Sequence, residues 1–332
     1  MDPLSQAVLG AGLAMALAHR DRQRVACLAG AVGGLVPDLD VLIRSAQDPL
    51  LALEFHRHFT HSLAMIPFLG AAVGWALGLL TRLRAVRRDL IVFGILGTAT
   101  HGLLDACTSY GTQLYWPFSN TRVAWHMIAI IDPIPTLTSL VFVVLAYVRR
   151  SPRLARVSFV FFVGYLGLCA LQRERAAALL KRVIAERGHS GHRLVVLPTI
   201  FNNIVFRSLY EHGGQYYIDA LRVTWTGREA VRAGTTIPVA TPEALVARLP
   251  QNSPQVQDVA TFSWFADGYL VSLADGSVGD VRYAVSPESN ELLWWITLHP
   301  ESPQRHVSFV VGRTFDALAR SRFLNFVLHG SD

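Results

Sequence analysis

The stretch that decides the fold is EFHRHFTHSLAMIPFLGAAVGWALGLL, residues 54–80. Its first part carries the ionisable side chains of Glu54, His56, His58 and His61, whereas residues 63–80 contain no charged side chain. A helix rises 1.5 Å per residue, so about 20 apolar residues cross the hydrocarbon core of a bilayer. The apolar part therefore predicts a membrane span, and the polar part places metal-capable side chains at the end of that span.

The remainder of the first 175 residues extends this pattern. Apolar runs at 90–104, 128–148 and 157–171 predict further spans, and weaker runs at 4–18 and 25–36 predict either re-entrant segments or helices packed against the others. The chain of 332 residues has a mean hydropathy of +0.34 and only 16% charged residues, too apolar for a protein that is soluble throughout. We therefore expect an α-helical multi-span membrane domain at 1–175. No basic region precedes the first run, so we expect no removable signal peptide.

Arginine-rich loops predict the orientation of these spans. The basic loops are HRDRQR (19–24), RLRAVRR (82–88) and RRSPRLAR (149–156). The positive-inside tendency assigns them to the cytoplasm, and the loops with acidic and histidine motifs then share the periplasmic face. The net charge of +6 is explained by these membrane-flanking arginines. No basic, aromatic-interleaved patch indicates nucleic-acid binding.

Two short motifs place carboxylate and imidazole groups near predicted helix ends. In PDLD (37–40), Asp38 and Asp40 lie two residues apart after a proline that interrupts a helix. In HGLLD (101–105), His101 and Asp105 are spaced i, i+4 and share one face of a helix. They can hold one metal together, or one can orient the other.

The third motif, HRHFTH (56–61), requires a bend. His56 and His61 are five residues apart, which is about 140° around an ideal helix, so they approach one ion only if the chain turns between them. We therefore predict a loop or helix start at 57–59, and a helix that begins near Thr60 with its hydroxyl as the cap. His58 is assigned to substrate contact or to an outer position around the metal.

Each motif alone also has a structural interpretation, because core histidines and helix-capping aspartates are common. Together they favour a site, since ionisable groups at a membrane are costly and are expected to face one another or a wet cavity. Histidine and carboxylate without thiolate form the ligand set of a zinc- or manganese-type hydrolytic site. The predicted metal ligands are Asp38, Asp40, His56, His61, His101 and Asp105.

Other catalytic and redox motifs are missing from the sequence. It contains no GxSxG nucleophile motif, no GxxxxGK[ST] phosphate loop and no CxxC pair. Cys27, Cys107 and Cys169 lie far apart in apolar segments, and their odd number argues against a disulfide framework. We expect three buried thiols.

An ordered set of motifs resembles a known family. These are MDPLSQAVLGA (1–11), PDLD (37–40), FHRHFTHS (55–62), HGLLDACTSYGTQLYWPFS (101–119) and IIDP (130–133). The set resembles the membrane-bound metal-dependent hydrolase family that includes the bacterial inner-membrane protein YdjM, over about residues 1–150. The resemblance implies a metal-dependent hydrolase in the bacterial inner membrane, and it selects the same six ligands. Many members carry a Thr-His pair where this chain has Ser5 and Gln6. That difference puts an N-terminal ligand in doubt.

Residues 188–332 predict a soluble α+β domain, on the outer side of the membrane. Segments such as HRLVVLPTI (192–200) and NIVFRSLYEHGGQYYIDALRV (203–223) combine β-branched and aromatic residues with turn signals, as an antiparallel sheet does. Thr241 and Pro242 predict the start of a short helix, and a last helix is predicted at 313–327. The histidines of this region show no ligand spacing.

The predicted function is metal-dependent hydrolysis at the membrane. A bound divalent metal, zinc or alternatively manganese, activates a water molecule, and Asp40 or Glu54 serves as general base. The expected partner is membrane lipid, and the expected substrate is a phosphoester or a lipid-linked molecule. The alternative is a metal-binding transporter or a non-catalytic structural membrane protein. A transporter is expected to show internal repeats and broken helices at the midplane, and no duplicated pattern is present.

Overall fold

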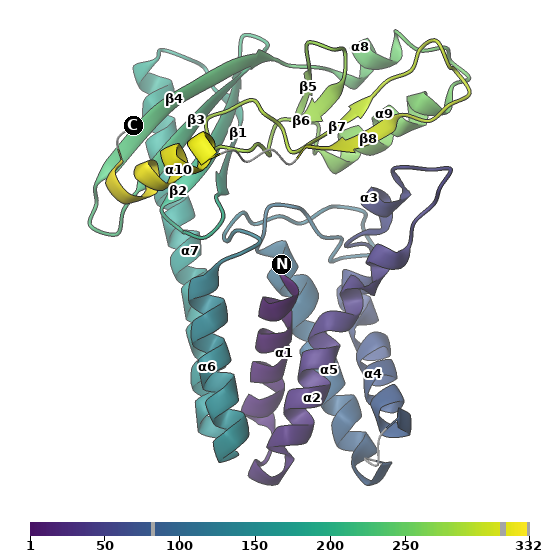
Figure 1. Cartoon of the computed structure of the whole chain (residues 1–332), viewed down its shortest axis with the longest axis vertical. Helices are drawn as coiled ribbons and strands as arrows, with labels where there is room; N and C mark the ends of the chain where they lie inside the picture. The colour runs from purple at the N-terminus through teal and green to yellow at the C-terminus, as the bar shows by residue number, and fades with distance from the viewer. Residues whose placement is uncertain (81–83, 313–316, 331–332) are drawn as a thin grey trace. The chain divides into compact units, whose positions relative to one another are not determined.

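The computed structural model describes residues 1–80, 84–312 and 317–330, and Figure 1 shows its helices and strands. The chain forms two compact units. The first contains Met1–Leu42, Phe55–Leu171 and Ile200–Asn202, and the second contains Ile43–Glu54, Gln172–Thr199 and the residues from Asn203 onward. The first unit is helical and the second combines helices with two antiparallel sheets, which confirms the predicted fold class.

Six helices build the first unit within the part of it that the structure describes. They are α1 (Pro3–Leu17), α2 (Gln23–Leu35), α4 (Ile66–Leu80), α5 (Arg87–Ala106), α6 (Pro133–Arg149) and the first part of α7 (Pro152–Glu186). Short 3-10 turns join them: η1 (Arg20–Arg22), η2 (Val36–Leu42), η3 (Phe59–His61), η4 (Leu63–Met65) and η5 (Arg84–Val86). In Figure 1, α1, α2, α5 and α4 lie side by side as the purple and blue helices.

Three helical segments among the described residues are long and apolar enough to cross a membrane: Arg20–Leu42, Arg84–Ala106 and Pro152–Glu186. A fourth span is present if the pair Leu51–His61 and Leu63–Leu79, bent by 56°, counts as one. Large apolar side chains on the outer faces, such as Phe68 (67% exposed) and Val160 (67% exposed), suit contact with lipid. The weak run at 25–36 is therefore part of a candidate span, whereas α1 and α6 are shorter apolar helices.

Two predicted helix starts are wrong, and both have local causes. The run at 128–148 becomes helical only at Pro133, because the Asp132 side chain accepts a hydrogen bond from the backbone N–H of Ile134 and so caps α6. The helix predicted to begin near Thr60 begins at Ile66, after the two 3-10 turns. The Thr60 hydroxyl instead donates to Asp40.

Glycines bring α1, α2 and α5 into backbone contact. A methyl group built on Gly97 of α5 lies 2.2 Å from the carbonyl oxygen of Gly30 on α2, and one built on Gly10 of α1 lies 2.5 Å from the same oxygen. Helices in lipid approach this closely only where small residues face each other. The ends of the three helices are thereby held within reach of one another.

The second unit contains two four-stranded antiparallel sheets, each ordered as in the sequence. The first has β1 (His192–Pro198), β2 (Val205–His212), β3 (Gln215–Val223) and β4 (Glu229–Pro238); the second has β5 (Leu270–Ser272), β6 (Val278–Asp280), β7 (Trp294–Thr297) and β8 (Ser308–Val311). The predicted Gly-Gly turn joins β2 to β3, with both glycines at positive φ. The apolar face of the first sheet packs on Leu180 and Ile184 of α7.

Four short helices complete the second unit: α3 (Leu51–Phe55) at its boundary, α8 (Pro242–Val246), α9 (Pro254–Phe265) and α10 (Ala317–His329). The Thr241 side chain accepts from the backbone N–H of Ala244, so the predicted cap of α8 is confirmed. The last helix was predicted to start at residue 313, which lies outside the described residues. All three cysteines are free, and two of them, Cys107 and Cys169, are buried.

A glycine substitution tests the backbone contact. Gly97→Ala is expected to lower stability by about 1–3 kcal/mol, because the added methyl collides with a backbone oxygen that no side-chain rotation can remove. Gly164→Ala in α7 is the matched control, since nothing lies within 4 Å of its added methyl. Thermal unfolding of the detergent-purified protein measures both. Equal midpoints for the two variants would contradict the close contact.

Candidate metal centre

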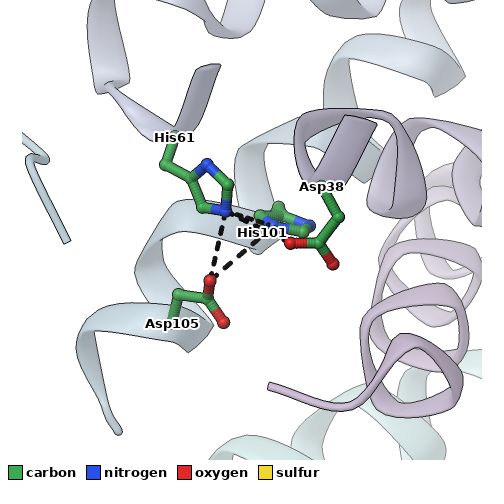
Figure 2. A group of neighbouring side chains, drawn as sticks. All are labelled: Asp38, His61, His101 and Asp105. Carbon is green, nitrogen blue, oxygen red and sulfur yellow. Dashed lines mark hydrogen bonds and ion pairs between the residues drawn. The ribbon is translucent and has the colours of Figure 1, made fainter. Parts of the chain in front are cut away.

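Four side chains from three parts of the first unit converge on one point (Figure 2). The Nε2 atoms of His61 and His101 are 2.9 Å apart, and Oδ1 of Asp38 lies 3.4 Å from each of them. Oδ2 of Asp105 lies 3.2 Å from Nε2 of His61 and 3.8 Å from Nε2 of His101. Two imidazoles and two carboxylates therefore face a common centre.

The spacing of these atoms suits a metal ion. Four ligands at about 2.1 Å from a tetrahedral ion lie about 3.4 Å from one another. The measured distances, between 2.9 and 3.8 Å, fall on both sides of that value. The side chains of His61, His101 and Asp105 are fully buried, and that of Asp38 is 26% exposed, so the centre is reached from the Asp38 side.

The two histidines are held as metal ligands are held. Nδ1 of His101 lies 2.6 Å from the carbonyl oxygen of Gly34, which can only accept, so the ring proton is on Nδ1. Nδ1 of His61 lies 3.0 Å from the Thr60 hydroxyl, which itself donates to Asp40 over 2.9 Å. When each ring carries its only proton on Nδ1, both Nε2 atoms present lone pairs to each other across 2.9 Å. A cation at the centre resolves that repulsion.

The acceptor for His101 comes from the way α2 ends. The last carbonyls of a helix have no partner within the helix. Pro37, four residues after Gly33, has no N–H to donate, and the Gly33 carbonyl accepts from the Thr98 hydroxyl of α5 instead, over 3.1 Å. The next carbonyl, that of Gly34, accepts from His101. The PDLD motif thus prepares the site through its backbone as well as through its aspartates.

A glycine also admits His61. A methyl group on Gly102 of α5 lies 2.1 Å from the carbonyl oxygen of His61. The 3-10 turn that carries His61 therefore rests directly on the α5 backbone between His101 and Asp105, and only glycine leaves room for it. This contact explains why the HRHFTH and HGLLD motifs meet.

Polar groups surround Asp105. Its Oδ1 accepts from Nε2 of Gln6 over 2.9 Å and also contacts the amino group of Met1. Its Oδ2 lies 3.0 Å from Nε of Arg57. Gln6 therefore reaches the site as a donor to a ligand carboxylate.

A second group of candidate ligands adjoins the first. Asp38, Asp40 and His56 bring their ligand atoms within 4.8 Å of one another, and Asp38 belongs to both groups. Nδ1 of His56 lies 2.9 Å from Oδ1 of Asp40, and Oδ2 of Asp40 accepts from the backbone N–H of Arg57. All six predicted ligands thus lie in these two groups, which offer donor sets for one ion or for two that share Asp38.

The other two residues singled out in the sequence lie apart from these groups. The Glu54 side chain is exposed and belongs to neither. The ring of His58 packs between Phe55 and Trp116, at centroid distances of 5.4 and 5.6 Å. His58 therefore has aromatic neighbours, and its position is outside both ligand groups.

Sequence reasoning did not identify Arg57, Thr60 or Gln6 as parts of the site. The only signal for Arg57 was its position inside HRHFTH, between two histidines.

A third group of candidate ligands, Asp48, Asp258 and His306, lies in the second unit. Asp258 accepts hydrogen bonds from Nδ1 of His306 and from the backbone N–H of Val307. These hydrogen bonds explain why Asp258 and His306 lie together without a metal ion. The long sequence separation of its members concealed it.

Comparison with known proteins agrees with this geometry. Residues 1–176, more than half of the chain, match the family described as YdjM inner membrane protein. The chain belongs to the YdjM family. This match confirms the family resemblance, and the span-length helices agree with a protein of the inner membrane.

A curated relative matches as well. The chain is similar to "Uncharacterized protein YfhP" of Bacillus subtilis (strain 168), with 26% identity over 174 residues, which are 52% of this chain and 52% of the relative. The matched region thus spans about half the length of this relative. No solved structure matches the chain. For this YdjM family member, all six residues of the two adjoining ligand groups fall within the region that matches the family.

Metal content tests the centre. His101→Ala removes an inward nitrogen and is expected to abolish stoichiometric metal binding. Thr60→Val removes one of the two groups that orient His61, the other being Asp40, and is expected to weaken metal binding by about 10–100-fold. His19→Ala and Thr121→Val, both at exposed positions, are the controls. Elemental analysis and metal titration of detergent-purified protein provide the measurement. Unchanged metal content in His101→Ala would contradict the assigned ligand set.

Proposed function

We propose that this protein is a membrane-bound metal-dependent hydrolase. The observation that carries the proposal is the pair of inward imidazole nitrogens, 2.9 Å apart, completed by Asp38 and Asp105 at ligand spacing. A zinc ion, or alternatively manganese, suits two nitrogen and two oxygen donors. Such an ion supplies Lewis acidity and lowers the pKa of a bound water.

The residues of the chain then have distinct roles. His61, His101 and Asp105 are buried and hold the ion, and Asp38 holds it from the accessible side. Asp40 orients both His56 and His61, because its two oxygens face Nδ1 of each ring. The role of general base fits Asp40 better than Glu54, since Asp40 lies in the ligand group that adjoins the ion-holding residues and the exposed Glu54 lies in neither group.

The surroundings of the site favour an amphipathic substrate. Large apolar side chains next to the ligands are exposed: Leu39 to 58% and Leu42 to 75%, both in the η2 turn that carries Asp38 and Asp40. In the loop between α5 and α6, Phe118 is 89% exposed. Exposed apolar side chains at the end of membrane-spanning helices suit the lipid interface. We infer that the substrate is a phosphoester or a lipid-linked molecule presented from the membrane.

Turnover separates this proposal from a metal-binding transporter or a structural protein. Metal-loaded protein in detergent is expected to hydrolyse members of a panel of soluble and lipid phosphoesters, and a chelator is expected to abolish the activity. Asp40→Asn is expected to lower the rate at least tenfold, and Glu54→Gln is expected to leave it within about twofold because that side chain is exposed. Metal-loaded protein that hydrolyses no phosphoester would favour the non-catalytic alternatives.

Orientation is a separate proposal, and it places the centre and the second unit on the periplasmic side. A cysteine introduced at Phe118, an exposed position in the α5–α6 loop, is expected to react with an impermeant thiol reagent added to intact cells. A cysteine introduced at Arg150, between α6 and α7, is expected to react only after the membrane is opened. The reverse labelling pattern would place the site in the cytoplasm.

A further inference from the structure

Arg57 occupies an unusual position beside the metal centre. Its side chain is only 5% exposed, and its backbone has a φ of +64°, a left-handed conformation that is costly for a residue with a side chain. The backbone is held there by two hydrogen bonds: its N–H donates to Asp40, and its carbonyl oxygen accepts from the N–H of Gln113. The chain therefore bears the cost of a strained backbone and of a buried charge at the same residue.

The guanidinium group is fixed on one side by contacts with α5 and the residues that follow it. Nε lies 3.0 Å from Oδ2 of Asp105, and Nη1 donates to the Thr108 hydroxyl over 2.8 Å. The group lies over the ring of Tyr110, with 4.7 Å from Cζ to the ring centroid. These contacts hold the guanidinium plane rigid next to a ligand carboxylate.

The Nη2 atom of the Arg57 guanidinium remains available for a hydrogen bond to a ligand. Among the residues that the structure describes, Nη2 of Arg57 donates to no protein atom, and it is not enclosed as Nε is. The guanidinium of Arg122 lies over the same Tyr110 ring, 5.2 Å from its centroid, and Nη2 of Arg122 donates to the Tyr110 carbonyl oxygen. Two positive charges thus flank one ring beside the metal centre.

We propose that Arg57 is the anion-binding residue of this site and that Nη2 binds a phosphoryl oxygen of the substrate. The inference rests on the proposed hydrolase function and narrows its substrate to a phosphoester. A phosphoryl group has several oxygens, so it can face the ligand centre and the guanidinium together. Arginine suits this task because its planar fork contacts a carboxylate and a phosphate at once, whereas the single ammonium of lysine cannot.

Phosphate binding to the full-length, detergent-purified protein tests this role. Inorganic phosphate is titrated calorimetrically into metal-loaded and metal-free wild type, Arg57→Gln, Arg57→Lys and Arg20→Gln, the last being an exposed control for the change in charge. Arg57→Gln is expected to weaken phosphate binding by about 10–100-fold, because a charge-assisted hydrogen bond is lost. Arg57→Lys keeps the charge beside Asp105, so it is expected to stay folded, retain its metal and still bind phosphate about tenfold more weakly.

Metal content and thermal unfolding are measured on each variant. Phosphate affinity equal to wild type in both Arg57 variants would overturn the proposal. So would loss of the metal or of the fold in both variants, since Arg57 would then serve only to position Asp105. Absence of metal or of turnover in the wild type would instead refute the proposed function, so the two failures are distinguishable.

A second pair of probes identifies the source of the phosphoryl group. Glycerol 3-phosphate in solution and phosphatidic acid in detergent micelles carry the same phosphomonoester on different bodies. If the wild type binds the two probes equally, and Arg57→Gln weakens the binding of both to the same extent, the site recognises only the phosphate group. Tighter binding of phosphatidic acid by the wild type, with the same dependence on Arg57, identifies a lipid headgroup. An Arg57-independent affinity for both probes counts against the proposal.

Discussion

Backbone contact between α1, α2 and α5 is the constraint on which the site depends. The carbonyl oxygen of Gly30 lies where a side-chain methyl at either Gly10 or Gly97 would be, so larger residues would push the three helices apart. Because the helices touch, the end of α2 is close enough to α5 for Gly34 to meet His101. In lipid the hydrophobic effect does not drive helices together, because the lipid tails are as apolar as the side chains. Van der Waals contact across this close packing holds the three helices together instead.

The metal centre brings several buried charged groups together, and each of them needs a partner of opposite charge. Three carboxylates and two inward nitrogens lie close together in a mostly buried space, and the Arg57 guanidinium and the Met1 amino group supply positive charge beside Asp105. A buried charge is stable only with partners. The divalent ion proposed for the centre and the guanidinium of Arg57 together complete that balance, which is why the same residue can hold a ligand carboxylate and still face an incoming anion.

Much of this arrangement follows from the sequence, and the remainder depends on tertiary contacts. Hydropathy predicts the helical unit, turn signals predict the sheets, and ligand chemistry selects all six residues of the two adjoining groups. The helix start at Ile66 could not be predicted, because Thr60 gives its hydroxyl to Asp40, a residue on another segment, and so does not cap the helix. Arg57 could not be identified from the sequence, because arginine is not a metal ligand and its partner, Asp105, lies 48 residues away in the chain.

The bond between His101 and the Gly34 carbonyl has a consequence for how this site can evolve. In many metal centres the group that orients a histidine is a side chain, which one mutation can delete or exchange. Here the orienting atom belongs to the main chain, so exchanging the side chain at position 34 does not delete it, but a side chain there would meet the Gln6 carbonyl oxygen of α1 at 2.4 Å. Genetic drift can reach that interaction only by shifting the helix. The tautomer of His101 is thus fixed by the backbone fold. The orientation of His61 depends in part on the Thr60 hydroxyl, so a single substitution at position 60 can change it.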